Sequence, residues 1–153
     1  MAVGDFGCGE GRLQLDLEGQ GHQGKVHSFD VGKAQDHIIQ CDIASVPLKD
    51  RELDIGVFCL ALMGTNFVDF LKEANRVLKK GGKLFVAEIA SRVPDITEFV
   101  RLLREELGFK SLKVSKLKDF FYILIFEKEQ ECKELKQSEA LRQILSPCKY
   151  KKR

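Results

Sequence analysis

The fold of this 153-residue chain is decided by the stretch Val3-Gly4-Asp5-Phe6-Gly7-Cys8-Gly9-Glu10-Gly11-Arg12. A short apolar segment leads into an acid and then into three glycines at alternate positions. Because glycine has no Cβ, such a run lets the backbone turn tightly and approach a ligand closely. If a strand enters the turn and a helix leaves it, the helix N-terminus offers unpaired N–H groups to a carboxylate or phosphate. The stretch therefore predicts a strand–loop–helix ligand site, with a simple mobile turn as the alternative.

The spacing of the glycines distinguishes between classes of cofactor. A dinucleotide-binding fingerprint that starts at Gly7 needs glycine at position 12, where this chain has arginine. The loop reads Asp-x-Gly-x-Gly-x-Gly, which is similar to the pattern of S-adenosylmethionine-dependent methyltransferases. The chain has no Gly-Lys-Ser or Gly-Lys-Thr, which disfavours a nucleotide triphosphatase. A nicotinamide-dependent oxidoreductase stays as a further alternative.

The totals describe one globular domain. A formal net charge of +2 produces no global field that would indicate nucleic acid or a membrane. The apolar run 55–63 is shorter than the about 20 residues that span a bilayer. The five cysteines have no zinc-ligand spacing, and the three histidines are scattered. We therefore expect neither a metal site nor a membrane partner.

Segments rich in β-branched and aromatic residues alternate with helical patterns, which predicts an α/β fold with a mostly parallel sheet. The expected strands are 2–5, 25–30, 37–42, 53–62 and 83–89, followed by a hairpin of 112–117 and 120–126. Helices are expected after the glycine loop, over 67–78, over 95–107 and, on the surface, over 131–145. Thr65 or Asn66 is expected to cap the second helix and Gly81-Gly82 to stop it, while Asp95 and Glu98 form a capping box for the third.

Ligands of such sheets bind at the carboxyl ends of the strands, which places two acids near the glycine loop. Asp30 follows Gly7 at close to the roughly 20-residue offset of an acid that binds ribose hydroxyls. A carboxylate accepts hydrogen bonds from both hydroxyls, although an exposed strand-end aspartate is an equal alternative. Asp42 ends the next strand, where it could accept from the amine of an adenine.

Two apolar positions complete the predicted pocket. Ile43 could cover the face of the adenine ring, with an ordinary core position as the alternative. Cys59 lies near the carboxyl end of the fourth expected strand and could form a wall, with a small buried side chain as the alternative. The expected cofactor-binding residues are therefore Gly7, Gly9, Asp30, Asp42, Ile43 and Cys59.

Several strings resemble the ribosomal RNA-processing protein 8 (nucleomethylin) family of class I methyltransferases. The most specific is Cys59-Leu60-Ala61-Leu62-Met63-Gly64-Thr65-Asn66. The others are Asp5-Phe6-Gly7-Cys8-Gly9, Phe29-Asp30, Cys41-Asp42-Ile43, Val46-Pro47-Leu48, Glu73-Ala74-Asn75-Arg76-Val77-Leu78-Lys79, Val86-Ala87-Glu88 and Pro147-Cys148-Lys149-Tyr150-Lys151-Lys152-Arg153. The similarity runs almost from end to end.

The resemblance implies a Rossmann-like class I methyltransferase, with a mostly parallel seven-stranded sheet and a C-terminal antiparallel hairpin. Residues 1–130 would form the S-adenosylmethionine-dependent domain, and 131–153 its basic C-terminal extension. The implied activity is methylation of N1 of an adenosine in large-subunit ribosomal RNA, in the nucleolus. In animals it also implies ribosomal DNA silencing with histone-modifying partners. By position, Gly7, Asp30, Asp42, Ile43 and Cys59 would contact the cofactor.

The resemblance further implies helical sequence before the first strand, which closes the cofactor site and supplies a histidine contact. Met1 lies next to the first expected strand here, so a fragment, a short isoform or a half-open site is expected. The alternative function is accordingly a truncated module that binds cofactor or a chromatin partner without catalysis.

Methylation at N1 of adenine depends on placement, because that nitrogen already carries a lone pair. The step makes the ring cationic, so a nearby carboxylate such as Glu88 could stabilise it. Thr65 and Asn66 lie where the substrate would meet the fourth strand, with helix capping as the alternative. Arg92 and the basic run 149–153 could contact phosphate, with a solvated tail as the alternative for the run.

Overall fold

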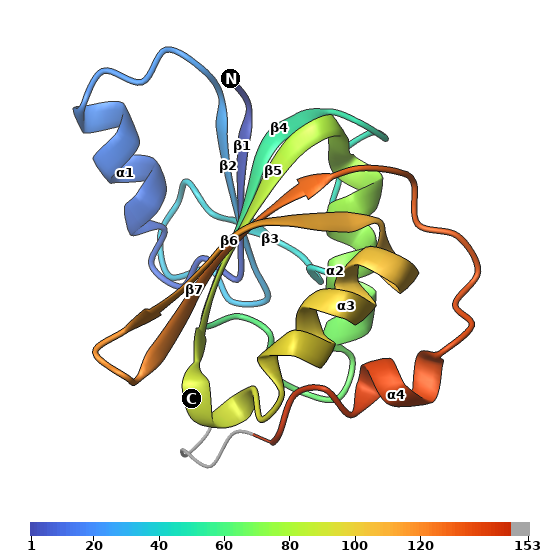
Figure 1. The fold of residues 1–153 in the computed structure, drawn as a ribbon. Helices are drawn as coiled ribbons and strands as arrows, with labels where there is room; N and C mark the ends of the chain where they lie inside the picture. The colour runs from blue at the N-terminus through green and yellow to red at the C-terminus, as the bar shows by residue number, and fades with distance from the viewer. Residues whose placement is uncertain (148–153) are drawn as a thin grey trace.

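The computed structural model describes residues 1–147 and contains one seven-stranded sheet with the strand order β3-β2-β1-β4-β5-β7-β6 (Figure 1). The strands are β1 Val3–Phe6, β2 Val26–Asp30, β3 Ile39–Gln40, β4 Leu53–Cys59, β5 Leu78–Ile89, β6 Phe109–Leu117 and β7 Phe121–Lys128. Strands β1 to β5 are parallel, whereas β7 is antiparallel to both β5 and β6. The predicted sheet with its C-terminal antiparallel hairpin is confirmed.

The helices lie on both sides of this sheet (Figure 1). They are α1 Arg12–Gly19, α2 Phe67–Val77, α3 Ile96–Leu107 and α4 Ser138–Arg142, with a short 3-10 turn at Ala90–Arg92. Figure 1 shows α2 and α3 on one side of the sheet and α1 on the other. Within residues 1–147, no helix has the length and apolar character needed to cross a bilayer.

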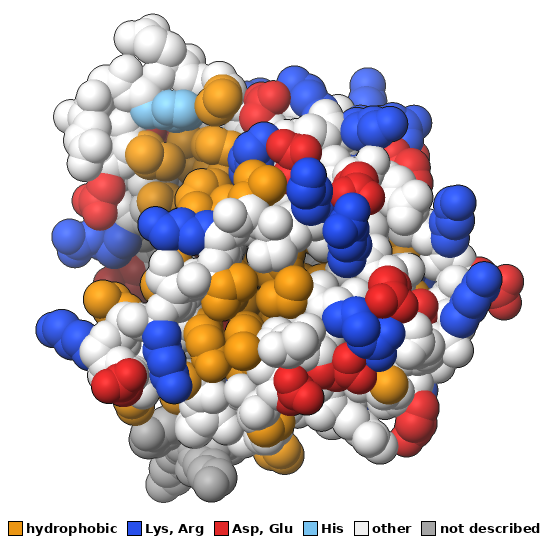
Figure 2. Space-filling model, viewed as in Figure 1, with side chains coloured by type: hydrophobic (Ala, Val, Ile, Leu, Met, Phe, Trp, Pro, Cys, Tyr) orange, Lys and Arg blue, Asp and Glu red, His pale blue; other side chains and the backbone are white. Residues whose placement is uncertain are grey.

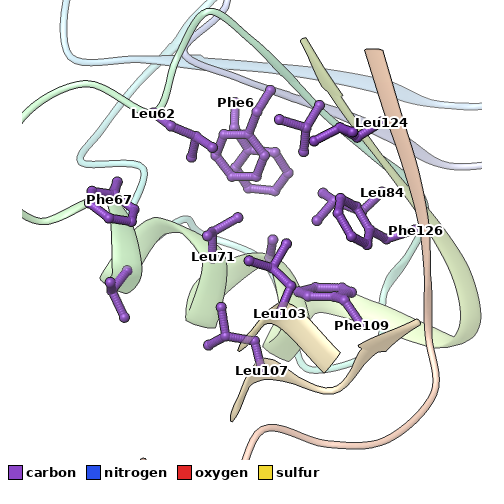
Figure 3. Packing of buried hydrophobic residues seen from close by; sticks show 14 of the residues in the cluster. Phe6, Leu62, Phe67, Leu71, Leu84, Leu103, Leu107, Phe109, Leu124 and Phe126 are labelled. Carbon is purple, nitrogen blue, oxygen red and sulfur yellow. The ribbon is translucent and has the colours of Figure 1, made fainter. Parts of the chain in front are cut away.

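The main core lies between the sheet and the pair α2 and α3. Phe6 of β1 stacks on Phe58 of β4, with ring centroids 4.9 Å apart. Leu71 of α2 and Leu103 of α3 belong to the same buried cluster, and Figure 3 shows them beside the strand side chains. Aromatic rings on the strands and leucines at helical spacing therefore hold the two layers together.

The opposite side of the sheet is covered unevenly. Helix α1 packs over β2, where the Gln14 side chain accepts a hydrogen bond of 2.7 Å from Ser28. Farther along the sheet, Val57, Phe85 and Ile125 lie directly opposite one another on β4, β5 and β7. We call these three residues the open sheet face, because Phe85 is 36% exposed and the other two are half-buried. Figure 2 shows that apolar side chains also gather in the middle of the viewed surface, between charges of both signs.

Two predicted elements have the expected boundaries. Helix α3 begins after Asp95, whose carboxylate accepts from the backbone N–H of Glu98 at 3.0 Å, and it ends at Gly108 with φ +75°. The β6–β7 turn consists of Lys118, Asp119 and Phe120, and the first two have φ values of +51° and +55°. Positive φ at both residues matches the twist of a tight hairpin, which confirms the predicted turn. The Asp95 cap of α3 is confirmed, but the reciprocal half of the predicted capping box is wrong, because the Glu98 carboxylate accepts from Arg101 instead.

The expected third strand is much shorter than predicted. Of residues 37–42, only Ile39 and Gln40 form β3, which pairs with Phe29 and Asp30 at the edge of the sheet. The His37 side chain turns instead toward the glycine loop, where its Nε2 lies 3.1 Å from the Gly11 carbonyl oxygen. This long-range contact replaces the first part of the expected strand.

The prediction that Gly81-Gly82 stops the second helix is wrong. Helix α2 ends at Val77, and β5 starts at once with Leu78. The ammonium of Lys128, on β7, donates to the backbone carbonyls of Asn75 and Leu78. A distant side chain therefore satisfies the end of the helix, which no local sequence pattern could indicate.

The expected surface helix over 131–145 is also wrong. Only Ser138–Arg142 is helical, while Leu141, Ile144 and Leu145 are buried against the core. The Glu106 carboxylate accepts from two successive backbone N–H groups of this segment, those of Lys136 and Gln137. Because α3 supplies that acceptor, the backbone of the segment is satisfied without a long helix.

Candidate cofactor site

The glycine loop joins β1 to α1 and adopts left-handed backbone throughout its glycines. Gly7, Gly9 and Gly11 have φ values of +74°, +60° and +72°. A Cβ at Gly7 would lie 2.8 Å from the Cβ of Ala61, whereas a Cβ at Gly9 would meet nothing within 4 Å. Gly7 is therefore required for packing against the segment after β4, and Gly9 leaves open space in which a ligand can approach the backbone.

Helix α1 begins directly behind this loop without a capping side chain. Its N-cap is Gly11, and the first turn contains no acidic residue. The first N–H groups of the helix therefore keep their capacity to bind an anion, and the helix dipole favours negative charge there. The loop and helix together fit a carboxylate or phosphate group.

Asp30 closes the site from β2. Its Oδ2 accepts from the backbone N–H of Gly9 at 2.7 Å, and its Oδ1 accepts from that of Gly32 at 3.2 Å. The glycine loop and Asp30 therefore lie in contact, as the sequence predicted. A carboxylate has about four acceptor positions, so Asp30 can still accept from hydroxyl groups of a ligand.

The connection after β3 brings the next two predicted residues to the same edge. The backbone N–H of Cys41 donates to the Asp30 carbonyl at 2.8 Å, which holds the segment beside β2. Asp42 is exposed, and its carboxylate accepts from the N–H of Ala44. Ile43 is buried, and its Cδ1 would lie 3.9 Å from a Cβ at Gly7. Ile43 is therefore a core residue that also lines the floor under the glycine loop.

Cys59 ends β4 and is exposed, so the alternative of a small buried side chain is wrong. The strand stops there rather than at position 62, because Leu60 has φ +56°. The Leu60 N–H still donates to the Ala87 carbonyl on β5 at 2.9 Å. An uncommon backbone conformation at the end of a central strand is typical of functional sites.

Asp5 and Cys8 acquire unusual protonation behaviour at this edge. Burial, assisted by the charge of Asp30, raises the pKa of the Asp5 carboxyl to about 6. Burial and the neighbouring carboxylates of Asp5 and Asp30 raise the pKa of the Cys8 thiol to about 12. Cys8 therefore stays protonated at neutral pH and is unsuited to act as a nucleophile.

Sequence reasoning missed two features of the site. It treated Asp5 only as part of the loop pattern and did not predict its raised pKa, and it gave His37 no role. The His37 ring occupies the position that a Cβ at Gly11 would take. This contact makes glycine necessary at position 11, but no spacing rule links two residues so far apart.

The carboxyl end of β5 holds a buried ion pair. Glu88 and Arg92 are 1% and 4% exposed, and Nη1 of Arg92 lies 3.1 Å from Oε2 of Glu88. Arg92 Nε also donates to the Ser146 carbonyl at 2.9 Å, and the Ser146 N–H donates to the Arg92 carbonyl at 2.7 Å. The predicted phosphate contact of Arg92 is therefore wrong, because its guanidinium is buried. The basic run 149–153 lies outside the described residues.

The remaining candidates lie between β4 and α2. Thr65 and Asn66 are exposed, and Asn66 is the N-cap residue of α2 without a side-chain capping hydrogen bond. The predicted N-cap position of Asn66 is confirmed, but the expected side-chain capping hydrogen bond is not formed. Both side chains remain available at the carboxyl end of the sheet. Glu88, in contrast, is enclosed with Arg92 and has no open path to a ligand.

A cavity of about 530 Å³ is lined by residues of α2, such as Lys72 and Glu73, by Cys132 after β7, and by Ala44, which follows Ile43. Its lining includes no residue of the glycine loop. In the described part of the chain, no group of three histidine, cysteine or acidic side chains is arranged to bind a metal ion.

Comparison with known proteins gives a family and several relatives. All residues 1–153 match the model of a family described as "Hypothetical methyltransferase". The chain is 42% identical over 153 residues to Ribosomal RNA-processing protein 8 of Mus musculus. The matched region covers 100% of this chain and 32% of that protein. The chain is 41% identical over 157 residues to the 25S rRNA (adenine(645)-N(1))-methyltransferase of Schizosaccharomyces pombe, covering 100% of this chain and 47% of that protein. The chain thus spans less than half the length of each of these two relatives.

Solved structures share the fold at lower identity. A 1,6-didemethyltoxoflavin-N1-methyltransferase from Burkholderia thailandensis, solved with S-adenosylhomocysteine, has a TM-score of 0.71 and 16% identity, covering 84% of this chain and 71% of that one. A SAM dependent methyltransferase from Aquifex aeolicus has a TM-score of 0.66 and 20% identity, covering 84% and 82%. The class I methyltransferase architecture is therefore confirmed.

Proposed function

The chain belongs to this methyltransferase family, and from that membership we propose that it uses S-adenosylmethionine to methylate N1 of an adenosine in large-subunit ribosomal RNA. The observation that carries the proposal is the hydrogen bond of 2.7 Å between the Gly9 N–H and the Asp30 carboxylate. It joins an anion-binding loop to a hydroxyl-binding acid at one edge of the sheet. A relative is named for this reaction, and its similarity covers 100% of the present chain.

Each part of the site fits one part of the cofactor. The unpaired N–H groups at the start of α1 suit its carboxylate, and Asp30 suits the two ribose hydroxyls. Asp42 is exposed beside the buried Ile43, an arrangement that suits the polar edge and the flat face of an adenine. Cys59 forms an exposed wall at the end of β4. When bound, the cofactor supplies an electrophilic methyl group.

The chain's own residues have mainly to position the target base. Adenine N1 carries a lone pair, so alignment matters more than a strong general base. Because N1 lies on the pairing edge of the base, the target must be unpaired or flipped out. Thr65 and Asn66 are exposed between β4 and α2, where they could hydrogen-bond the base. Glu88 would have an indirect role: its ion pair with Arg92 would hold the backbone segment that follows β5 in place.

The proposed place of action is the nucleolus, where large-subunit ribosomal RNA is made and processed. Relatives named Ribosomal RNA-processing protein 8 support a role in ribosome biogenesis. A part in ribosomal DNA silencing, as a chromatin regulator with histone-modifying partners, stays a prediction.

Two binding measurements and one transfer assay test the proposal. Calorimetry with S-adenosylhomocysteine should show binding, whereas NAD should bind far more weakly or not at all. Unmodified ribosomal RNA incubated with the protein and methyl-labelled cofactor should then acquire label at N1 of adenosine. A preference for NAD would contradict the methyltransferase assignment.

A second candidate function is a binding module that holds the cofactor or a chromatin partner without transferring a methyl group. The open sheet face of Val57, Phe85 and Ile125 favours it, because apolar side chains there are available to another segment or protein. Binding of S-adenosylhomocysteine without any transfer to ribosomal RNA would support this second function over the first.

A further inference from the structure

The end of β6 and the turn that follows it present two lysines and an exposed aromatic ring. We propose that Lys116, Lys118 and Phe120, here called the hairpin tip, dock an unpaired segment of RNA beside the cofactor site. This inference rests on the proposed function, because it assigns part of the substrate-binding surface of the same reaction.

The hairpin tip lies at the reaction edge of the sheet. Phe121, the first residue of β7, pairs with Ile89, the last residue of β5. The backbone N–H of Ala90 donates to the Phe120 carbonyl at 2.7 Å, which ties the turn to the 3-10 segment after β5. Strand β5 runs parallel to β4 and β1, whose carboxyl ends form the cofactor site. In Figure 1 the turn and the 3-10 segment lie together in the lower part of the view.

The two lysines of the hairpin tip carry positive charge that no carboxylate among residues 1–147 neutralises through an ion pair. By contrast, Lys79 and Lys83 pair with Asp54 and Glu127. The Lys116 ammonium lies over the Tyr122 ring, 5.5 Å from its centroid, which leaves its charge available to an anion. Ammonium groups without a carboxylate partner suit a polyanion, and neutralising phosphates releases counterions.

Phe120 supplies the second recognition element. Its side chain is 46% exposed, although a residue of this kind is usually buried. It contacts the Phe121 ring edge to face, with centroids 4.7 Å apart and planes at 83°, which fixes its orientation. Nucleobases stack on such exposed aromatic side chains, each stack contributing about 1–3 kcal/mol.

Protection of an edge strand explains the lysines only in part. Strand β6 is the last strand of the sheet, and lysines on an edge strand hinder unwanted pairing with other chains. That role fits Lys110 and Lys113 as well as Lys116. It does not explain an exposed phenylalanine at the turn, since an apolar ring there would favour association.

The chemistry favours unpaired RNA over a duplex. Stacking on Phe120 needs a base that has left its own stack, and an A-form duplex offers mainly phosphates and sugars. Methylation at N1 sets the same requirement, because the target base must be unpaired. One splayed segment could therefore satisfy both the site and the hairpin tip.

The test compares variants for binding of a short adenosine-rich single-stranded RNA, measured by fluorescence anisotropy at several salt concentrations. Lys116→Ala/Lys118→Ala should lower the salt slope of log affinity by about 1.4, at about 0.7 per single-strand phosphate. The charge-matched control Lys110→Ala/Lys113→Ala should leave the slope near that of the unmodified chain. Phe120→Ala should weaken binding about 5- to 150-fold without changing the slope, and Phe120→Trp should restore it.

Calorimetry with S-adenosylhomocysteine runs beside each measurement. If the unmodified chain fails to bind it, the proposed function fails. A second outcome is that every variant binds S-adenosylhomocysteine normally while the hairpin-tip variants have the same RNA affinity and salt slope as the control variant. In that case only the proposed role of the hairpin tip is excluded, and the proposed function stands. The same RNA annealed to its complement should bind more weakly and be insensitive to Phe120→Ala. The proposal would be overturned if the duplex bound as tightly as the single strand, or if polyglutamate displaced the single strand as well as unlabelled RNA does. Either result would indicate a surface that binds any polyanion.

Discussion

The Asp30 carboxylate has two roles: it accepts a hydrogen bond from Gly9 of the glycine loop, and in the proposed site it binds the ribose hydroxyls of the cofactor. We expect Asp30→Ala to weaken S-adenosylhomocysteine binding by at least about 1 kcal/mol, or about fivefold, since a charge-assisted hydrogen bond is lost. Calorimetry measures this directly. Asp36→Ala is the control, because Asp36 is an exposed acid in the neighbouring connection. Equal affinities for the two variants would remove Asp30 from the site.

Asp5 should make the stability of the fold depend on pH. Burial and then Asp30 raise the pKa of its carboxyl from 3.8 to about 6, so the folded state binds the proton more tightly than the unfolded state. The free energy of unfolding should therefore fall as pH rises from about 4 to about 6, by about 3 kcal/mol in total, and stay level above. Asp5→Asn should remove this fall.

Urea unfolding at a series of pH values, with the Asp5→Asn variant measured in parallel, tests this expectation. The quantity to compare is the difference between the two proteins at each pH, since other carboxyl groups contribute to both. A difference that favours the unmodified protein increasingly as pH rises would contradict the assigned direction.

At the scale of single residues, the sequence predicted positions better than environments. The spacing from Gly7 to Asp30 correctly placed both at one edge, because parallel strands bring their carboxyl ends together. The burial of Arg92 was not predictable, since it depends on Glu88 and on Ser146, which is distant in sequence. Burial and pairing arise only after the chain has folded.

At the scale of elements, helices α2 and α3 differ in how they begin. Asp95 caps α3 with a side-chain hydrogen bond, whereas Asn66 precedes α2 without one. We expect Asp95→Ala to lower the free energy of unfolding by about 1 kcal/mol and Asn66→Ala to change it little. Urea midpoints of the two variants provide the measurement. Equal losses would mean that Asn66 also caps its helix in solution.

Local patterns predicted α3 and the hairpin well, because their capping and turn residues lie within the elements themselves. They failed at the end of α2 and over 131–145. At the end of α2, Lys128 from β7 donates to the backbone carbonyl of Leu78. In the segment 131–145, Glu106 from α3 accepts from the backbone N–H of Lys136. Where a distant side chain satisfies the backbone, periodicity within a window has no information about the boundary.

For the whole molecule, Lys128 links the C-terminal hairpin to α2. Its side chain is fully buried, and its ammonium donates to the carbonyls of Asn75 and Leu78 and to the Glu131 carboxylate. We expect Lys128→Met to lower the free energy of unfolding by about 2–4 kcal/mol, because buried carbonyls lose their donor. Urea unfolding checks this. The control is Lys110→Met, at an exposed lysine with no ion pair among the described residues. Similar losses in both variants would exclude a special role for Lys128.

The anchoring of Ser146 by Arg92 bears on how the protein should be purified and labelled. Two hydrogen bonds hold Ser146 just beyond the end of β5, at the edge of the sheet where the cofactor site lies. A bulky label attached to the Ser146 side chain would therefore lie at that edge, where it would compete with large ligands. Met1, which leads into the opposite end of β1, is the better attachment point for immobilisation.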